Sequence, residues 1–169
     1  MQFVRKTLFA TAVAASLIAS AHGATSVQTL DITWYKDGQV IDSGRHIINN
    51  NTGPAPYLHR SGKEVGYASC SGTAGAMRLS AEKKFVGRSL LIEPVSVNSG
   101  KVRLTVSAID TVLDGIRKVG TADCTSEVVD VHGYTASDLP VELADGQNVE
   151  VPMKNPQYRL VLNLHRDAL

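Results

Sequence analysis

The feature that most constrains the fold of this chain is the alternation of apolar and polar residues at a period of two. Residues 30–35, 102–108 and 158–164 each place apolar side chains at every second position. Successive side chains of a β-strand point to opposite faces of a sheet, so each segment predicts a strand with one buried face. The predicted core-facing residues are Leu30, Ile32 and Trp34; Val102, Leu104, Val106 and Ala108; and Tyr158, Leu160, Leu162 and Leu164.

Turn sequences separate the alternating segments at short intervals. Asp37-Gly38, Asn98-Ser99-Gly100, Asp114-Gly115 and Asp145-Gly146 are each typical of turns between strands. Strands spaced in this way, with no long helical pattern between them, indicate antiparallel sheets. We therefore predict an all-β domain, an antiparallel β-sandwich or barrel of roughly 8–10 strands with at most one short helix.

The pattern is weaker between the clearest strands. Residues 39–48 predict two return strands interrupted at Ser43-Gly44, and residues 65–70 predict a short strand. Residues 49–56 hold three asparagines and two prolines and predict a loop. Residues 77–84 fit either two helical turns or a loop.

The first residues have the composition of a bacterial export signal. Arg5 and Lys6 precede an uncharged run of apolar and small residues over 8–18, and small residues follow at the positions that a signal peptidase requires. This order predicts cleavage after Ala21 or Gly23. The run is too short to span a bilayer, which needs about 20 residues. The predicted organisation is a signal peptide over residues 1–23 and a single β domain over residues 24–169.

Two cysteines, Cys70 and Cys124, lie in the predicted exported domain. An even pair in an oxidising compartment predicts a disulfide bond, and the absence of a C-x-x-C spacing argues against a redox pair or a metal ligand pair. We therefore expect a disulfide-bonded protein in the periplasm or secreted outside the cell.

Charge balance excludes two classes of function. The whole chain has 17 basic and 16 acidic residues, and removal of Arg5 and Lys6 with the signal leaves one more acidic than basic residue. A nucleic-acid binder would show a basic surplus, and so would a protein that binds anionic membranes through a polybasic surface. We expect neither nucleic acid as a partner nor a transmembrane segment after cleavage.

One ordered set of segments falls between Ser43 and Leu113. An asparagine run is followed by a short strand, and then by a Val-Gly strand ending in proline, a turn and an alternating strand. This order resembles the conserved β-core of the bacterial secretins, although Gly66 stands where that family has a proline. The chain is too short for a secretin's periplasmic modules and membrane barrel, so the resemblance implies a sheet module of an envelope assembly, not a pore. The segments are Asn49-Asn50-Asn51, Gly62-Lys63-Glu64-Val65-Gly66-Tyr67, Val86-Gly87-Arg88-Ser89-Leu90-Leu91-Ile92-Glu93-Pro94, Asn98-Ser99-Gly100 and Val102-Arg103-Leu104-Thr105-Val106.

Motifs of catalysis are missing from the sequence. It has no G-x-S-x-G, no phosphate-binding loop and no H-E-x-x-H. Asp110 with Asp114, or Asp123 with Glu127, are the carboxylate pairs nearest to a glycosidase arrangement. The histidines show no local ligand spacing of the kind that zinc sites use. We therefore expect no catalytic residue, no cofactor and no metal site.

Exposed aromatic residues indicate a binding function more strongly than the carboxylates and histidines indicate catalysis or metal binding. Tyr35, Tyr57, Tyr67 and Tyr134 fall on predicted polar faces or in loops, where tyrosines often build recognition surfaces. The candidate partner-binding loop contains Asn51, Tyr57 and His59.

The sequence favours one function and leaves two others open. It favours an exported, non-enzymatic β-domain that binds another envelope or extracellular protein, as an accessory of an envelope assembly. A small exported hydrolase or inhibitor and a periplasmic ligand or metal carrier are the alternatives.

Overall fold

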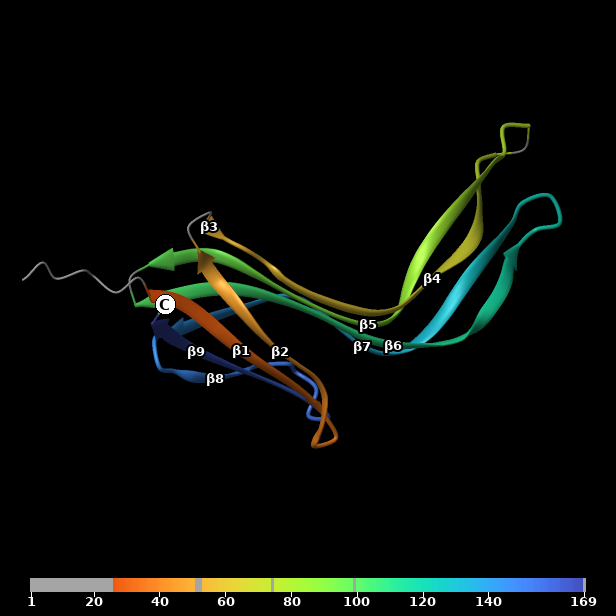
Figure 1. Cartoon of the computed structure of the whole chain (residues 1–169). Helices are drawn as coiled ribbons and strands as arrows, with labels where there is room; N and C mark the ends of the chain where they lie inside the picture. Colours follow the sequence, from red (N-terminus) through yellow and green to blue (C-terminus); the bar gives the residue numbers. More distant parts are fainter. Residues whose placement is uncertain (1–25, 51–52, 74, 99, 169) are drawn as a thin grey trace, which may run out of the picture.

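The computed structural model describes residues 26–50, 53–73, 75–98 and 100–168, and in these residues it contains nine strands and no helix. The strands form two antiparallel sheets, one of five strands and one of four, which pack face to face (Figure 1). The predicted all-β fold is confirmed in its sandwich form, because neither sheet closes into a barrel. The predicted signal peptide lies outside the described residues.

The five-stranded sheet has the order β3-β2-β1-β9-β8. The turn at Asp37-Gly38 joins β1 to β2 as predicted, with positive φ angles of 50° and 78° that suit the short hairpin turn. The C-terminal strand β9 then pairs with β1 along its whole length, from Ser26–Ala168 to Lys36–Tyr158. The strands are β1 (Ser26–Lys36), β2 (Gln39–Asn50), β3 (Gly53–Pro54), β8 (Asn148–Val151) and β9 (Tyr158–Ala168).

The four-stranded sheet has the order β4-β5-β6-β7, and its strands are much longer. The 21 residues of β5 extend over about 70 Å at the usual rise, whereas the 11 residues of β1 extend over about 35 Å. The longer sheet therefore overhangs the shorter one. Its strands are β4 (Tyr57–Ser71), β5 (Arg78–Asn98), β6 (Lys101–Gly120) and β7 (Thr125–Ala144).

The main core lies between the two sheets where they overlap. The alternating residues of the sequence fill it as predicted, and Trp34 is completely buried at its centre. Asp145-Gly146 is also a turn, and it carries the chain from β7 in one sheet to β8 in the other. The buried alternating residues are Leu30, Ile32, Trp34, Val102, Leu104, Val106, Ala108, Tyr158, Leu160, Leu162 and Leu164.

The overhanging part of the long sheet is a second body, which we call the arm: residues 62–71, 78–87, 111–120 and 125–133. It consists of the β4–β5 hairpin and the β6–β7 hairpin and bends away from the sandwich (Figure 1). The arm has its own small apolar cluster, in which Val65, Val86 and Val129 are buried. Tyr67, Leu113 and Val131 pack against these valines.

Strand neighbours change between the sandwich and the arm. Pairing of β5 with β6 ends at Arg88–Asp110, and beyond that point each hairpin continues as a two-stranded ribbon. Such ribbons twist more strongly than wide sheets. In the arm β4 consequently lies beside β7, and β5 and β6 are on the outside (Figure 1).

Glycines allow the sharp bend at the base of the arm. Gly62 and Gly87 are paired residues of β4 and β5, and a Cβ on Gly87 would lie 2.5 Å from the Cα of Gly62. Gly87 and Gly133 have φ angles of +137° and +129°, which L side chains rarely adopt. The backbones at the bend therefore approach too closely for any larger residue.

Three local predictions from the sequence are wrong, and the predicted loop over residues 49–56 is correct only in part, because Asn49 and Asn50 belong to β2 and Gly53–Pro54 form β3. Residues 77–84 are neither helix nor loop, because β5 begins at Arg78 and pairs regularly with β4. β2 is continuous through Ser43-Gly44. Asp114-Gly115 lies inside β6, where a register shift between Leu113 and Gly115 marks a β-bulge instead of a turn. The strand expected over residues 65–70 exists, as part of the longer β4.

The predicted disulfide between Cys70 and Cys124 is present. It joins the end of β4 to the turn between β6 and β7, with a Cα–Cα distance of 5.5 Å. The bond therefore connects the two hairpins near the tip of the arm, where no backbone ladder joins them.

We expect removal of this disulfide to destabilise the protein substantially. The bond closes a loop of 54 residues, and the chain-entropy relation gives about 4 kcal/mol as an upper figure for its contribution. A Cys70→Ser/Cys124→Ser variant should show a lower urea midpoint than the oxidised wild type, and reduced wild type should match the variant. Equal midpoints for all three would show that the bond does not stabilise the arm.

Replacing a glycine by alanine at the bend should lower the free energy of unfolding more than the same replacement elsewhere in the arm. Gly87→Ala places a Cβ against the Gly62 backbone and strains a positive φ, so we expect a loss of more than about 1 kcal/mol. Gly115→Ala is the matched control, because its Cβ would meet no atom within 4 Å. Denaturant unfolding of both variants provides the comparison, and a Gly87→Ala variant as stable as Gly115→Ala would refute this account of the bend.

Candidate functional site

A charged network anchors the arm to the sandwich. Asp110, at the last position where β6 pairs with β5, is buried and accepts hydrogen bonds from the Lys36 ammonium and the Tyr158 hydroxyl, each at 2.9 Å. The Arg88 guanidinium lies 3.4 Å from the other carboxylate oxygen. We call these four residues the junction. Because Lys36 and Tyr158 come from the five-stranded sheet, the junction joins both sheets at the base of the arm.

The junction shifts the pKa of its members. Burial raises the pKa of Asp110, but the hydrogen bonds from Lys36 and Tyr158 and the charge of Arg88 outweigh it, and the net pKa lies below 3.8. The hydrogen bond to Asp110 raises the pKa of Lys36. Burial, with the hydrogen bond to Asp110, raises the pKa of Tyr158. The contribution of Asp110 to the free energy of unfolding is present above about pH 4 and is lost in acid. The contributions of Lys36 and Tyr158 are present below about pH 10 and are lost as the pH rises.

Two further polar contacts join the sheets beside the junction. Arg88 donates from Nη1 to the carbonyl oxygen of Ile41 at 2.8 Å. The Nδ1 atom of His59 lies 2.6 Å from a carboxylate oxygen of Asp42, which is buried. These contacts lie between the main core and the valine cluster of the arm, so polar interactions separate the two apolar bodies.

Side chains of β7 close the arm against β4. The amide of Ala68 donates to the Glu127 carboxylate at 2.9 Å, and the amide of Cys70 donates to the Ser126 hydroxyl at 2.9 Å. Across the interior, the Lys84 ammonium donates to the carbonyl oxygen of Val129 at 3.1 Å. The two hairpins are therefore held together by side-chain hydrogen bonds, a few valines and the disulfide.

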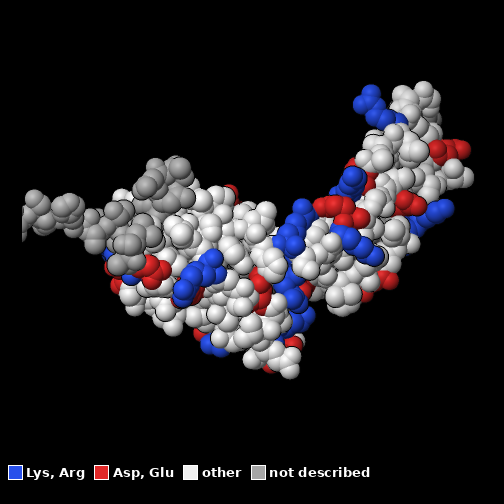
Figure 2. Space-filling view, in the orientation of Figure 1, with Lys and Arg blue, Asp and Glu red and all other residues white. Residues whose placement is uncertain are grey.

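The arm exposes apolar side chains that its small core does not use. Leu79 is 70% exposed, Val112 is 54% exposed and Ile116 is 47% exposed, and Met77 beside the tip is 42% exposed. Figure 2 shows acidic and basic side chains mixed along the arm, and lysine and arginine side chains gathered at the bend. Leu79 lies on β5 and Val112 and Ile116 on β6, so the exposed apolar area is distributed over both outer strands of the arm.

The residues of the candidate partner-binding loop do not lie together on a loop. Asn51 lies outside the described residues, whereas Tyr57 and His59 belong to β4. The Tyr57 ring packs against the main core and against the His46 ring. Both Tyr57 and His59 therefore have structural contacts within the sandwich.

One of the four tyrosines expected to be exposed is buried. Tyr134 is 7% exposed, its hydroxyl donates to the Met153 carbonyl, and its ring stacks on Tyr158. The other three are partly exposed. The Arg159 guanidinium lies over the Tyr35 ring, and the Tyr67 hydroxyl donates to Glu82 at 2.6 Å in the arm.

The carboxylates considered for acid–base chemistry are engaged by different partners. Asp110 belongs to the junction, Asp114 lies 2.5 Å from His132, and Glu127 binds the Ala68 amide. Asp123 lies in the turn between β6 and β7. Within the described ranges, no group of three histidine, cysteine or acidic residues is placed to hold a metal ion.

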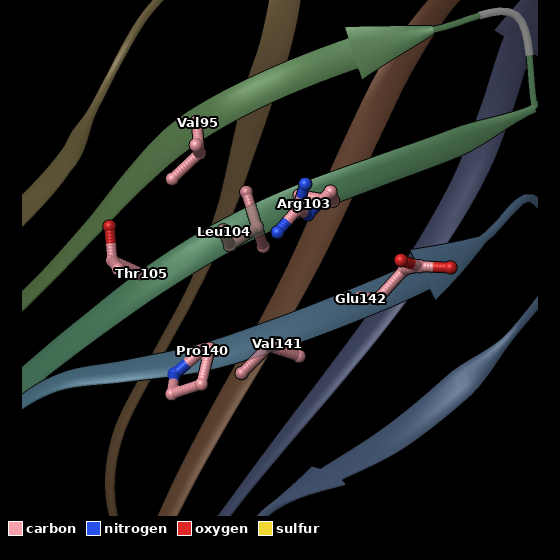
Figure 3. A pocket seen from close by; sticks show the side chains of 7 residues that line it. All are labelled: Val95, Arg103, Leu104, Thr105, Pro140, Val141 and Glu142. Carbon is pink, nitrogen blue, oxygen red and sulfur yellow. The ribbon is translucent and has the colours of Figure 1, made fainter.

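A shallow depression of about 390 Å³ lies over β5, β6 and β7 on the sandwich (Figure 3). Its charged lining side chains are Arg103 and Glu142, and the latter accepts a hydrogen bond from Lys101 at 2.9 Å. Figure 3 shows that the side chains point in several directions instead of toward a common centre. The lining of this depression therefore contains no set of side chains arranged for catalysis. Its lining residues are Val95, Arg103, Leu104, Thr105, Pro140, Val141 and Glu142.

The part of the chain that the structure describes has no helix of the length and apolarity needed to cross a membrane. Comparison of the chain with models of known protein families, with curated proteins and with solved structures gives no match. The resemblance to the secretin β-core stays a prediction. The segments that suggested it are paired in part, since residues 62–63 of β4 pair with residues 86–87 of β5, and residues 92–94 of β5 pair with residues 104–106 of β6.

Neutralising Asp110 should destabilise the protein in a pH-dependent way. Asp110→Asn deprives the Lys36 ammonium and the Arg88 guanidinium of a counter-charge, so we expect a loss of about 2 kcal/mol at pH 7. Because protonation removes the same charge from the wild type in acid, the difference should shrink as the pH falls below about 4. Urea unfolding at pH 7 and pH 3 measures it, and a difference that is equal at both values would contradict the role of the carboxylate.

Proposed function

We propose that this chain is an exported, non-enzymatic β-domain that binds another protein of the envelope or the extracellular space, and that the arm makes the contact. The observation that carries the proposal is the arm itself. About half of β5, β6 and β7, and two thirds of β4, lie outside the main core, in a body whose interior is three buried valines with three partly buried neighbours. Such an extension adds little to the stability of the sandwich, so a different role has to account for it.

The construction of the arm supports a role in binding. The disulfide, the bridging hydrogen bonds and the junction limit its movement before any partner arrives. Binding by an element that is already ordered avoids the entropy cost of ordering it in the complex. The exposed Leu79, Val112 and Ile116 supply apolar area that a partner would remove from water.

Export is the context in which these features fit together. The predicted signal peptide would deliver the chain to an oxidising compartment, where the bond between Cys70 and Cys124 is stable. The near balance of charge after cleavage fits a protein partner better than nucleic acid. No specific observation in the described residues favours a hydrolase or an inhibitor, and none favours a ligand or metal carrier. We therefore do not propose these alternatives.

A matched pair of surface substitutions tests the arm as the contact. Leu79→Asp places a charge on the arm, and Val40→Asp places the same charge on the sandwich, at a residue that is 56% exposed in β2. Both sites are exposed, so both variants should keep the wild-type melting temperature. We expect in-cell crosslinking of a tagged chain to recover a specific partner with the wild type and with Val40→Asp, and to lose it with Leu79→Asp.

Two outcomes would count against this proposal. Recovery of the same partner with Leu79→Asp but not with Val40→Asp would place the contact on the sandwich. If the wild type gives no specific partner in the periplasm, the membrane or the medium, the binding function itself is wrong.

A further inference from the structure

The strand edges of the arm differ in whether they are free to pair with another chain. The edges of β4 and β7 face each other. The β4 amides of Ala68 and Cys70 already donate hydrogen bonds to the side chains of Glu127 and Ser126 in β7. The other two edges, on β5 and β6, lie on the outside of the arm (Figure 1). Among the described residues, 78–87 pair with β4 alone and 111–120 pair with β7 alone.

The two outer edges are not equivalent. In β6 a bulge between Leu113 and Gly115 interrupts the regular row of amide and carbonyl groups, and edge bulges are a common protection against unwanted pairing. In β5 the register with β4 is regular from Arg78 to Ile92 without a shift. At Gly87 the edge ends, because its φ is +137° and its amide donates to the Thr111 hydroxyl of β6 at 3.3 Å. The β5 edge is therefore the one that presents an uninterrupted run of strand residues, 78–86.

The net charge of the β5 edge favours a partner segment of opposite charge. Residues 78–87 contain three basic residues and one acidic residue. Their formal net charge is therefore +2. Glu82 accepts a hydrogen bond from the Tyr67 hydroxyl, and the Lys84 ammonium donates to the Val129 carbonyl. Within the described ranges, neither Lys83 nor Arg78 has an ion-pair partner.

We propose that the β5 edge over residues 78–86 accepts an acidic, extended segment of the partner protein by strand addition. Main-chain hydrogen bonds to the free edge would supply affinity, and the side chains along it would supply selectivity. This inference rests on the proposed function, because it specifies how the arm contacts its partner.

Strand geometry fixes a sequence pattern for the segment. Residues directly opposite one another on paired strands share a face, so an acidic residue opposite Lys83 and another opposite Arg78 lie five positions apart in the partner. The residue opposite Leu79 is the neighbour of the second acid, and it should be apolar because Leu79 is largely exposed.

Photo-crosslinking along β5 tests the inference on the full chain in the producing cell. A photoreactive amino acid is placed in turn at Leu79, Ala81 and Lys83, with Val40 on the sandwich as the control position. Strand addition predicts that the three arm positions crosslink to partner residues that step by two along one segment, in one direction. The crosslinked segment should carry the two acidic residues, and Val40 should give no crosslink to it.

A charge-reversal pair supplies the second measurement. Lys83→Glu should lower the crosslinking yield at Leu79 roughly fivefold, because an attractive cross-strand pair becomes a repulsive one. Lys63→Glu makes the same change in the same hairpin, but on β4, and should leave the yield unchanged. Salt should reduce the difference between Lys83→Glu and wild type, because exposed charges are screened.

The outcomes separate this inference from the function on which it rests. Crosslinks from the arm that show no linear order, or that map to a segment without acidic residues, would overturn strand addition and keep the arm as the contact. Equal effects of Lys83→Glu and Lys63→Glu would also overturn the assignment to the β5 edge. If no arm position crosslinks to any partner, the proposed function falls as well.

Discussion

The carboxylate of Asp110 is the constraint on which the rest of the architecture depends. It lies where β5 and β6 stop pairing, and it binds the Lys36 ammonium and the Tyr158 hydroxyl from the opposite sheet. A buried charge is tolerated only when it is paired and hydrogen-bonded, so the two sheets have to meet at this point in one arrangement. The junction thereby fixes where the sandwich ends and where the arm begins.

Two apolar bodies of unequal size follow from this arrangement. The sandwich core contains twenty buried residues, including Trp34, whereas the arm relies on three buried valines, a disulfide and a few bridging hydrogen bonds. Elements with few buried apolar contacts belong to the least stable parts of a protein. The covalent bond at the tip and the ion pairs at the base therefore act at the two ends of the arm, where its own core contributes least.

The sandwich could be predicted from the sequence because its strands bury one face each. Alternation at residues 30–34, 102–108 and 158–164 leads directly to the observed core. The pairing of the cysteines could be predicted as well, since the chain contains two cysteines and so offers a single combination. The candidate loop residues Asn51, Tyr57 and His59 followed from local composition alone, and local composition does not report that Tyr57 and His59 are paired in β4.

The arm escaped prediction for physical reasons that particular residues show. In residues 77–84 the local pattern is compatible with a helix, but pairing with β4 overrides it, as often happens when context decides strand formation. Asp114-Gly115 has the composition of a turn and forms a bulge. In the sandwich, Ser43-Gly44 suggested a break in β2, yet Gly44 allows close packing, because a Cβ there would lie 2.6 Å from the Tyr57 hydroxyl.

A distance measurement across the bend tests the central claim, that the junction holds the arm in one orientation ready for a partner. Nitroxide labels would be placed at Ser80 in the arm and Gln39 in the sandwich, through unnatural amino acids so that the disulfide is kept. Double electron–electron resonance on the free protein at pH 7 should give one narrow distribution of distances. A broad distribution, or two separate distances, would show that the arm moves freely about the bend and would contradict the account.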